Sequence, residues 1–145
     1  MIYADSSFIV ALFVRGDDHW DAAWQWWRAE GGPVLTVSRL GLFESENTIR
    51  ALSASGRIRA AECSLALEGI RRAVLEGVLS RRSAAEHQLF PAATRLSQHH
   101  TIKQTFGALD ILHVAAAKEL GAKQMLSFDQ RQRALAVAEG IAVLP

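Results

Sequence analysis

Short apolar runs alternate with longer amphipathic segments along the whole chain. A short apolar run between polar or turn residues is typical of a buried strand. Longer segments that begin near Ser or Asp and end at Gly carry the start and stop signals of helices. The pattern predicts strands at 2–4, 34–37, 124–128 and 141–144, and helices at 6–14, 17–30, 38–55, 59–79, 83–99, 107–120 and 129–139.

This alternation predicts an α/β fold in which helices cover both faces of a parallel sheet. We expect about four to five short strands and a single domain over residues 1–145, because a chain of this length forms one compact unit. Ligands of such sheets bind beyond the carboxyl ends of the strands. Asp5 and Asp129 each come directly after a predicted strand, so the candidate site begins with them.

Composition excludes several classes of protein. Apolar residues make up 50% of the chain, too many for a disordered segment. The single Cys63 excludes an internal disulfide and a zinc site with several cysteines. The longest strongly apolar run, residues 8–14, is too short to span a bilayer, and it lacks the features of a signal peptide. We therefore expect a soluble, cytoplasmic protein without a membrane partner.

Arginine is concentrated in one part of the chain. Residues 50–82 contain seven Arg and three Glu, a local balance of +4 in a chain whose net charge is +1. Guanidinium groups bind phosphate through two parallel hydrogen bonds, so Arg50, Arg71 and Arg72 are candidates for RNA binding. A solvated helical face whose charges pair with one another is the favoured interpretation of such a cluster.

Each candidate acid also has an ordinary structural interpretation. Asp5 and Asp129 are suitable N-caps for the helices that follow them. Glu44 and Glu46 lie on different faces of one predicted helix, and either could be an exposed helix carboxylate. Asp110 suits the first turn of a helix, where the helix dipole favours a negative charge. These interpretations and a catalytic role both stay open for the single residues.

The combination of acids is more informative than any one of them. Asp110 shares an apolar helix face with His113, and a carboxylate there is costly unless it is paired or binds a metal ion. A parallel sheet would bring several acids to one edge, where like charges need a counter-charge. Mg²⁺ prefers such oxygen ligands, and a site of this kind can activate water and bind a phosphodiester.

The chain resembles the PIN-domain family, and within it the small VapC-like toxins of bacterial toxin–antitoxin modules. The resemblance extends over nearly the whole chain, and four blocks carry it in the family's order: residues 2–12, 44–50, 109–117 and 126–131. The third block, Leu-Asp-Ile-Leu-His-Val-Ala-Ala-Ala, is the most specific of them. The resemblance implies a PIN-like three-layer fold, with a parallel sheet between two layers of helices.

The resemblance also implies which residues form the site. It selects Glu44 over Glu46, because the family's second block has Glu three residues before Asn47 and six before Arg50. Ser7 and Ser127 match the hydroxyl residues near the first and last acids. The four acids that it implies as catalytic residues and metal ligands are Asp5, Glu44, Asp110 and Asp129.

A metal-dependent endoribonuclease is the activity that the resemblance implies. One or two Mg²⁺ or Mn²⁺ ions would be the cofactors, RNA the substrate, and a cognate antitoxin and a second copy of the chain the partners. Two alternatives stay open: a non-catalytic PIN module that binds RNA or an antitoxin, and a metal-dependent phosphohydrolase of small substrates. Phosphate-loop, dinucleotide-binding and nucleophile-elbow motifs are absent from the sequence.

Two further features have a favoured structural interpretation. Trp20, Trp24 and Trp27 share one helix face, and such a stripe usually packs in the core. The alternative is an apolar groove or a dimer surface, where Trp is enriched. For His113 we favour a packed, hydrogen-bonded side chain over one that orients a substrate phosphate.

Overall fold

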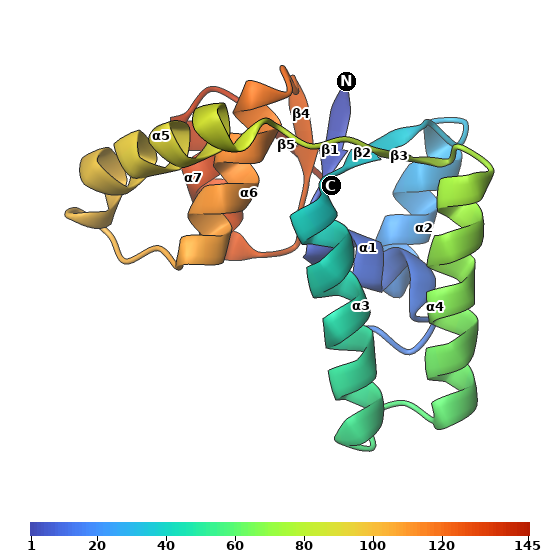
Figure 1. Cartoon of the computed structure of the whole chain (residues 1–145). Coiled ribbons are helices and arrows are strands. Elements are labelled where there is room, and N and C mark those ends of the chain that lie inside the picture. The colour runs from blue at the N-terminus through green and yellow to red at the C-terminus, as the bar shows by residue number, and fades with distance from the viewer.

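The computed structural model describes residues 1–145 as five strands, seven α-helices and a π-helical turn (Figure 1). The strands are β1 (Ile2–Ala4), β2 (Leu35–Val37), β3 (Leu79–Arg81), β4 (Gln124–Leu126) and β5 (Ala142–Leu144). The helices are α1 (Ser6–Phe13), α2 (Trp20–Ala29), α3 (Arg39–Ala54), α4 (Ala60–Leu75), α5 (Glu86–Leu96), α6 (Ala108–Glu119) and α7 (Gln130–Ala138), with the π-helical turn η1 (Ser97–Thr101) after α5.

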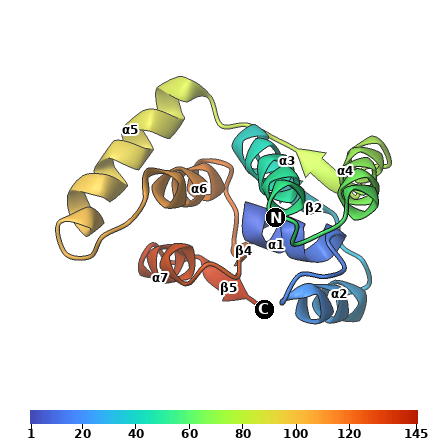
Figure 2. The ribbon, with the colours of Figure 1, turned by 90° about the horizontal axis from the view of Figure 1, so that it is seen from below.

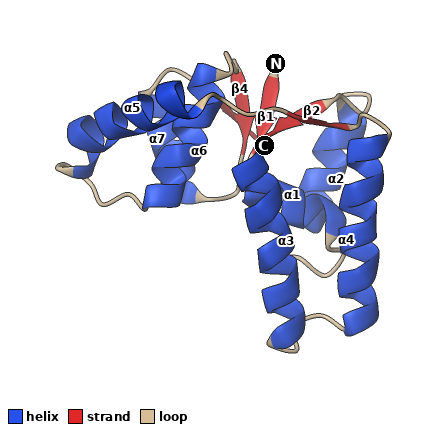
Figure 3. Cartoon of the chain, viewed as in Figure 1, coloured by secondary structure: helices blue, strands red, loops and turns tan.

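All five strands belong to one parallel sheet in the order β3-β2-β1-β4-β5 (Figure 3). Tyr3 of β1 lies opposite Thr36 of β2 on one side and Met125 of β4 on the other. The predicted α/β class and the parallel sheet are thus confirmed. Because the strands are parallel, the residues after β1, β2 and β4 all lie at the carboxyl ends of the strands, which form one edge of the sheet.

Helices cover both faces of the sheet. Helices α1–α4 pack on one face and α5–α7 on the other, and α3 and α4 extend well beyond the sheet as a long hairpin (Figures 1 and 2). The core is accordingly divided into two clusters, one around Phe8 of α1 and the other around Val114 of α6. Neighbouring strand residues point to opposite faces, so Ala4 packs in the first cluster and Tyr3 in the second.

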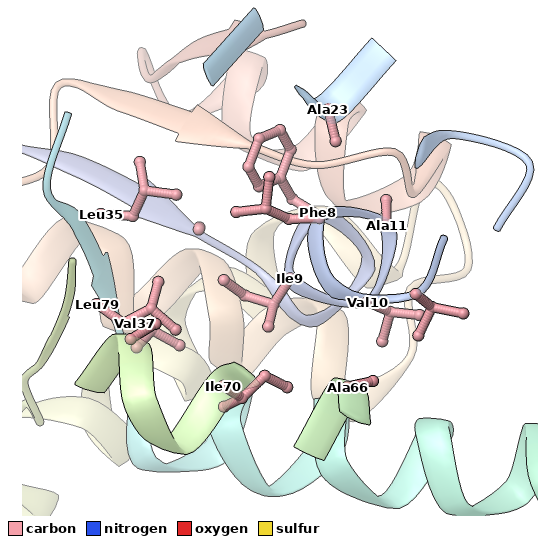
Figure 4. Packing of buried hydrophobic residues seen from close by; sticks show 14 of the residues in the cluster. Phe8, Ile9, Val10, Ala11, Ala23, Leu35, Val37, Ala66, Ile70 and Leu79 are labelled. Carbon is pink, nitrogen blue, oxygen red and sulfur yellow. The ribbon is translucent and has the colours of Figure 1, made fainter. Parts of the chain in front are cut away.

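Helix α1 is the most deeply buried helix on its face of the sheet. Figure 4 shows Ile9 between Val37 of β2 and Ile70 of α4, and Phe8 on the side of α1 that faces Ala23 of α2. Phe8 and Ile9 are both fully buried. Because α1 begins directly after β1, this packing fixes the position of Asp5 at the turn between them.

The structure differs from the predicted elements at four places. Strand β4 ends at Leu126 instead of residue 128, so two residues separate it from Asp129. Strand β3 was not predicted, and α4 ends at Leu75 instead of continuing to residue 79. Helix α5 begins at Glu86, not at residue 83, and continues into η1. Helix α2 begins at Trp20, after His19 rather than after an aspartate cap. None of the helices has the length and apolar character that a membrane crossing requires.

Candidate active site

Asp5 lies at the carboxyl end of β1 and is the N-cap of α1. Its Oδ1 accepts hydrogen bonds from Phe8 N (2.9 Å) and Ser7 Oγ (2.7 Å), and its Oδ2 accepts one from Ser127 Oγ (2.6 Å). The residue is fully buried, and none of the ion pairs in the structure includes it. Burial raises the pKa of the Asp5 carboxyl, although the three hydrogen bonds oppose that shift.

Two serines join the ends of β1 and β4. Ser7 Oγ accepts a hydrogen bond from Phe128 N (2.8 Å), and Ser127 Oγ accepts one from Asp129 N (3.1 Å). Both hydroxyls also donate to Asp5, so each one bridges the first and last acidic blocks of the sequence. This arrangement places Asp129 beside the end of β1.

Asp129 and Asp110 also lie at helix N-termini. Asp129 caps α7, where its Oδ1 accepts from Arg131 N (2.8 Å) and Gln132 N (3.0 Å). Asp110 lies in the first turn of α6, and its Oδ2 accepts from Gly107 N (2.8 Å). Gln132 connects the two, since its Nε2 lies 3.5 Å from Asp110 Oδ1. Three helix N-termini therefore favour negative charge at this site.

Glu44 reaches the site from α3 and contacts His113 of α6. Its Oε2 lies 2.7 Å from His113 Nε2, and 23% of its side chain is exposed. The hydrogen bond from His113 lowers the pKa of Glu44, and partial burial opposes that shift. Glu46 instead pairs with Arg50 on an exposed face of α3 (2.8 Å). The two glutamates, ambiguous in the sequence, thus have different surroundings, and only Glu44 contacts the helix that carries Asp110.

The remaining predicted site residues lie apart from the acids. Asn47 and Arg50 are exposed on α3. Arg71 and Arg72 are exposed on α4, and Arg71 pairs with Glu68 of the same helix (2.9 Å). This part of α4 leads into the first residue of β3. Arg71 and Arg72 therefore lie toward the amino ends of the parallel strands, whereas the acids lie at the carboxyl ends.

Two other arginines lie at the same edge as the acids. Arg39 is the first residue of α3, directly after Ser38, and Arg82 N donates to Val37 O at the end of β2 (2.9 Å). Both side chains are exposed, and neither takes part in an ion pair. Arg82 belongs to the Arg-rich stretch 50–82 that the sequence indicated, whereas Arg39 lies outside it. The strand-end rule could have found Arg39, but Arg82 depends on the unpredicted β3.

Trp24 and Trp27 of the α2 stripe pack against the first core cluster, as the favoured interpretation predicted, and Trp20 and Trp24 also border a groove. Trp20, Trp24 and Trp27 are each only partly buried, and the rings of Trp24 and Trp27 meet edge to face at 5.5 Å. Trp20 and Trp24 line a groove of about 760 Å³, together with Leu12, Phe13, Arg15, Asp21, Gln25 and Arg28.

The donor atoms at this edge fit a hard divalent cation, because carboxylate oxygens are the ligands that Mg²⁺ and Mn²⁺ prefer. Gln132 is 4% exposed, and its buried Oε1 has no hydrogen-bond donor, although the residue bonds to both Asp110 and Asp129. A water molecule carried by a hydrated cation is a donor suited to that oxygen. No three His, Cys, Asp or Glu side chains are close enough to form a complete metal cluster as they stand.

The chain belongs to the PIN-domain family, because the PIN domain family model matches residues 2–138. Its fold is similar to that of VapC20 from Mycobacterium tuberculosis, described as a toxin that cleaves the sarcin-ricin loop. The two chains are 23% identical, each is covered over 100% of its length, and the TM-score is 0.72. No curated protein matches the chain. The resemblance seen in the sequence, and the PIN-like fold that it implied, are confirmed.

Proposed function

We propose that this protein is a metal-dependent endoribonuclease and the toxin component of a toxin–antitoxin module. The observation that carries the proposal is the placement of Asp5, Asp110 and Asp129 at three helix N-termini around one edge of the sheet. Glu44 contacts His113 on α6, the helix whose first turn contains Asp110. Membership of the PIN-domain family and the fold shared with an RNA-cleaving toxin support this activity.

In this proposal Asp5, Glu44, Asp110 and Asp129 bind Mg²⁺ or Mn²⁺. A bound cation would neutralise their charges, polarise the scissile phosphate and lower the pKa of a water molecule. Ser7 and Ser127 keep the Asp5 carboxylate in one orientation, because each donates to one of its two oxygens. Asn47, exposed one turn after Glu44, is a candidate contact for the substrate.

Basic side chains bind the RNA backbone in this account. Arg39 and Arg82 are the stronger candidates, because they lie at the acidic edge without a carboxylate partner. Arg50, Arg71 and Arg72, the candidates from the sequence, are weaker, because Arg50 and Arg71 pair with glutamates of their own helices and Arg71 and Arg72 lie away from the acids. Phosphate contacts of this kind position the strand but do not read its bases.

The proposed partners follow from the family. We propose a cognate antitoxin, a homodimeric state and a cytoplasmic location. The groove lined by Trp20 and Trp24 offers the antitoxin an apolar surface with Arg and Asp side chains at its margins. Copurification with the product of a neighbouring gene, and the molar mass of the free chain in solution, test these partners.

Cleavage of labelled RNA tests the activity. Pools of tRNA, rRNA and mRNA are incubated with the protein in Mg²⁺ or Mn²⁺, and in EDTA. We expect defined fragments only in the presence of the metal. Binding without cleavage in every pool would contradict the proposal and favour a non-catalytic module. Turnover of small phosphate esters, with no cleavage of RNA, would identify a phosphohydrolase instead.

A further inference from the structure

A buried chain of hydrogen bonds connects Glu44 to the interior of the protein. His113 Nε2 lies 2.7 Å from Glu44 Oε2, and His113 Nδ1 lies 3.0 Å from the hydroxyl of Tyr3. That hydroxyl donates to Ser38 Oγ (2.9 Å), which also accepts from Gly41 N (2.9 Å). The chain therefore joins β1, the start of α3 and α6 around one imidazole ring.

The imidazole is fixed more firmly than the carboxylate that it contacts. His113 and Tyr3 are fully buried and Ser38 is 5% exposed, whereas Glu44 is partly open to solvent. A Cβ added at Gly41 would come within 3.4 Å of the His113 ring, so a glycine at this position lets α3 pack closely against it. Both ring nitrogens have partners, which leaves the ring little freedom to rotate.

A glutamate side chain has several rotatable bonds, and holding it in one geometry costs up to about 2 kcal/mol of conformational entropy. The bond from His113 orders Glu44 through Oε2, and a side-chain hydrogen bond from Ser6 also favours the charged form of this carboxylate. Hydrogen-bonded partners of this kind orient metal-binding carboxylates, and their removal lowers metal affinity or activity by about 10–100-fold.

From this geometry we propose that His113 is a positioning residue, which acts through its hydrogen bond to Glu44 and is itself oriented by Tyr3. The inference rests on the proposed nuclease function and adds a residue to it. A purely structural role would explain the buried contact with Tyr3. It would not require the second nitrogen to face a partly exposed carboxylate at the acidic edge.

Two matched variants separate these roles. In His113→Gln the amide can take the place of Nε2 and still donate to Glu44. In His113→Asn the shorter side chain can take the place of Nδ1 and reach Tyr3, but it cannot reach Glu44. We expect His113→Asn to lower kcat by about 10–100-fold with little change in KM for RNA. We expect His113→Gln to retain most of the wild-type kcat.

Two additional measurements test whether His113 acts through Glu44. In a Glu44→Gln background, His113→Asn should cause no further loss of rate, because the group that it positions is already removed. By NMR, the His113 Nε2 proton should be protected from exchange in the wild type and lose that protection in Glu44→Ala. This second measurement requires no activity. Unfolding midpoints confirm that each variant is folded.

The outcomes are distinguishable. Folded His113→Asn and His113→Gln proteins with equal kcat would overturn the positioning role while leaving the nuclease function intact, provided that Glu44→Gln is inactive. A wild-type protein that cleaves no RNA would overturn the proposed function and this inference with it. If neither His113 variant folds, Tyr3→Phe, which removes only the hydroxyl, should still lower kcat, and an unchanged kcat in that variant would contradict the inference.

Discussion

Ser127 donates a hydrogen bond of 2.6 Å to Oδ2 of Asp5, although 122 positions separate the two residues in the sequence. The contact is fully buried and joins the ends of two adjacent parallel strands. Sheet topology has therefore brought together the first and last acidic blocks, which the sequence resemblance identified separately. The hydrogen bonds between Ser127, Ser7 and Asp5 therefore stabilise the fold at the strand ends and also orient a carboxylate of the proposed active site.

Replacing Ser127 by alanine should destabilise the protein. The change removes a donor to a buried carboxylate and the acceptor for Asp129 N, so we expect a loss of about 1–3 kcal/mol. Urea unfolding at neutral pH measures it. Ser64→Ala is the matched control, because Ser64 is an exposed helix residue that bonds only to Ala60 O, and its change should stay within about 0.5 kcal/mol.

The raised pKa of Asp5 predicts how stability changes with pH in metal-free buffer. The folded chain binds the Asp5 proton more tightly than the unfolded chain does. The resulting stabilisation is complete below the unfolded pKa of about 3.9 and is lost as pH rises through the folded pKa. Asp5→Asn carries no charge at any pH. Relative to the wild type, its free energy of unfolding should therefore rise toward neutral pH.

Urea unfolding of both proteins between about pH 4 and pH 7.5 tests this prediction. Their difference isolates Asp5 from other titrating groups. Millimolar Mg²⁺ should stabilise the wild type and have little effect on Asp5→Asn, because a ligand stabilises only the state that binds it. A wild-type melting curve that does not respond to Mg²⁺ would count against a metal site at Asp5.

The two glutamates of α3 should differ in their effect on cleavage. Glu44→Gln should lower the rate at least about 100-fold, as expected for a charged group at the reacting centre. Glu46→Gln should retain most of the activity, because Glu46 contacts only the exposed Arg50. Initial rates on one labelled RNA compare them. The opposite result would mean that the second sequence block is misaligned by two residues.

Arginines at the carboxyl ends of the strands should contribute more to RNA binding than arginines near the amino ends. Replacing Arg39 and Arg82 by Gln should weaken binding to all RNAs. It should also reduce the slope of log K against log salt by about 1.4, the value for two phosphate contacts with a single strand. The matched control replaces Arg71 and Arg72 by Gln and should leave the slope unchanged. Titrations in an Asp110→Asn background prevent cleavage, and a reduced slope only in the control would reverse our assignment.

Sequence patterns predicted the fold well where the signals were local. Ser38 accepts from Gly41 N at the start of α3, and Asp129 caps α7, both as their residue types predict. Strand β3 was missed because only Val78 and Leu79 are apolar, while Ser80 and Arg81 follow them at the edge of the sheet. An exposed edge strand of three residues carries too weak a pattern to separate it from the helix before it.

The side-chain environments depended on contacts that no local pattern contains. Periodicity could not separate Glu44 from Glu46, because the partner that distinguishes them, His113, is 69 residues away from Glu44. The three tryptophans were assigned to the core because helical spacing shows a shared face but not what covers it. In the structure Trp24 and Trp27 pack against the core, whereas Trp20 lies at a groove that Trp24 also borders, and Trp26 packs against Phe8.

The central claim is that four acids form one metal-dependent nuclease site. Its most direct test is the rate of RNA cleavage in Mn²⁺ by the wild type and by Asp5→Asn, Glu44→Gln, Asp110→Asn and Asp129→Asn, each shown to be folded by circular dichroism. We predict metal-dependent cleavage by the wild type and a loss of at least about 100-fold in every variant. Wild-type cleavage that persists in EDTA, or variants that cleave at the wild-type rate, would contradict the account.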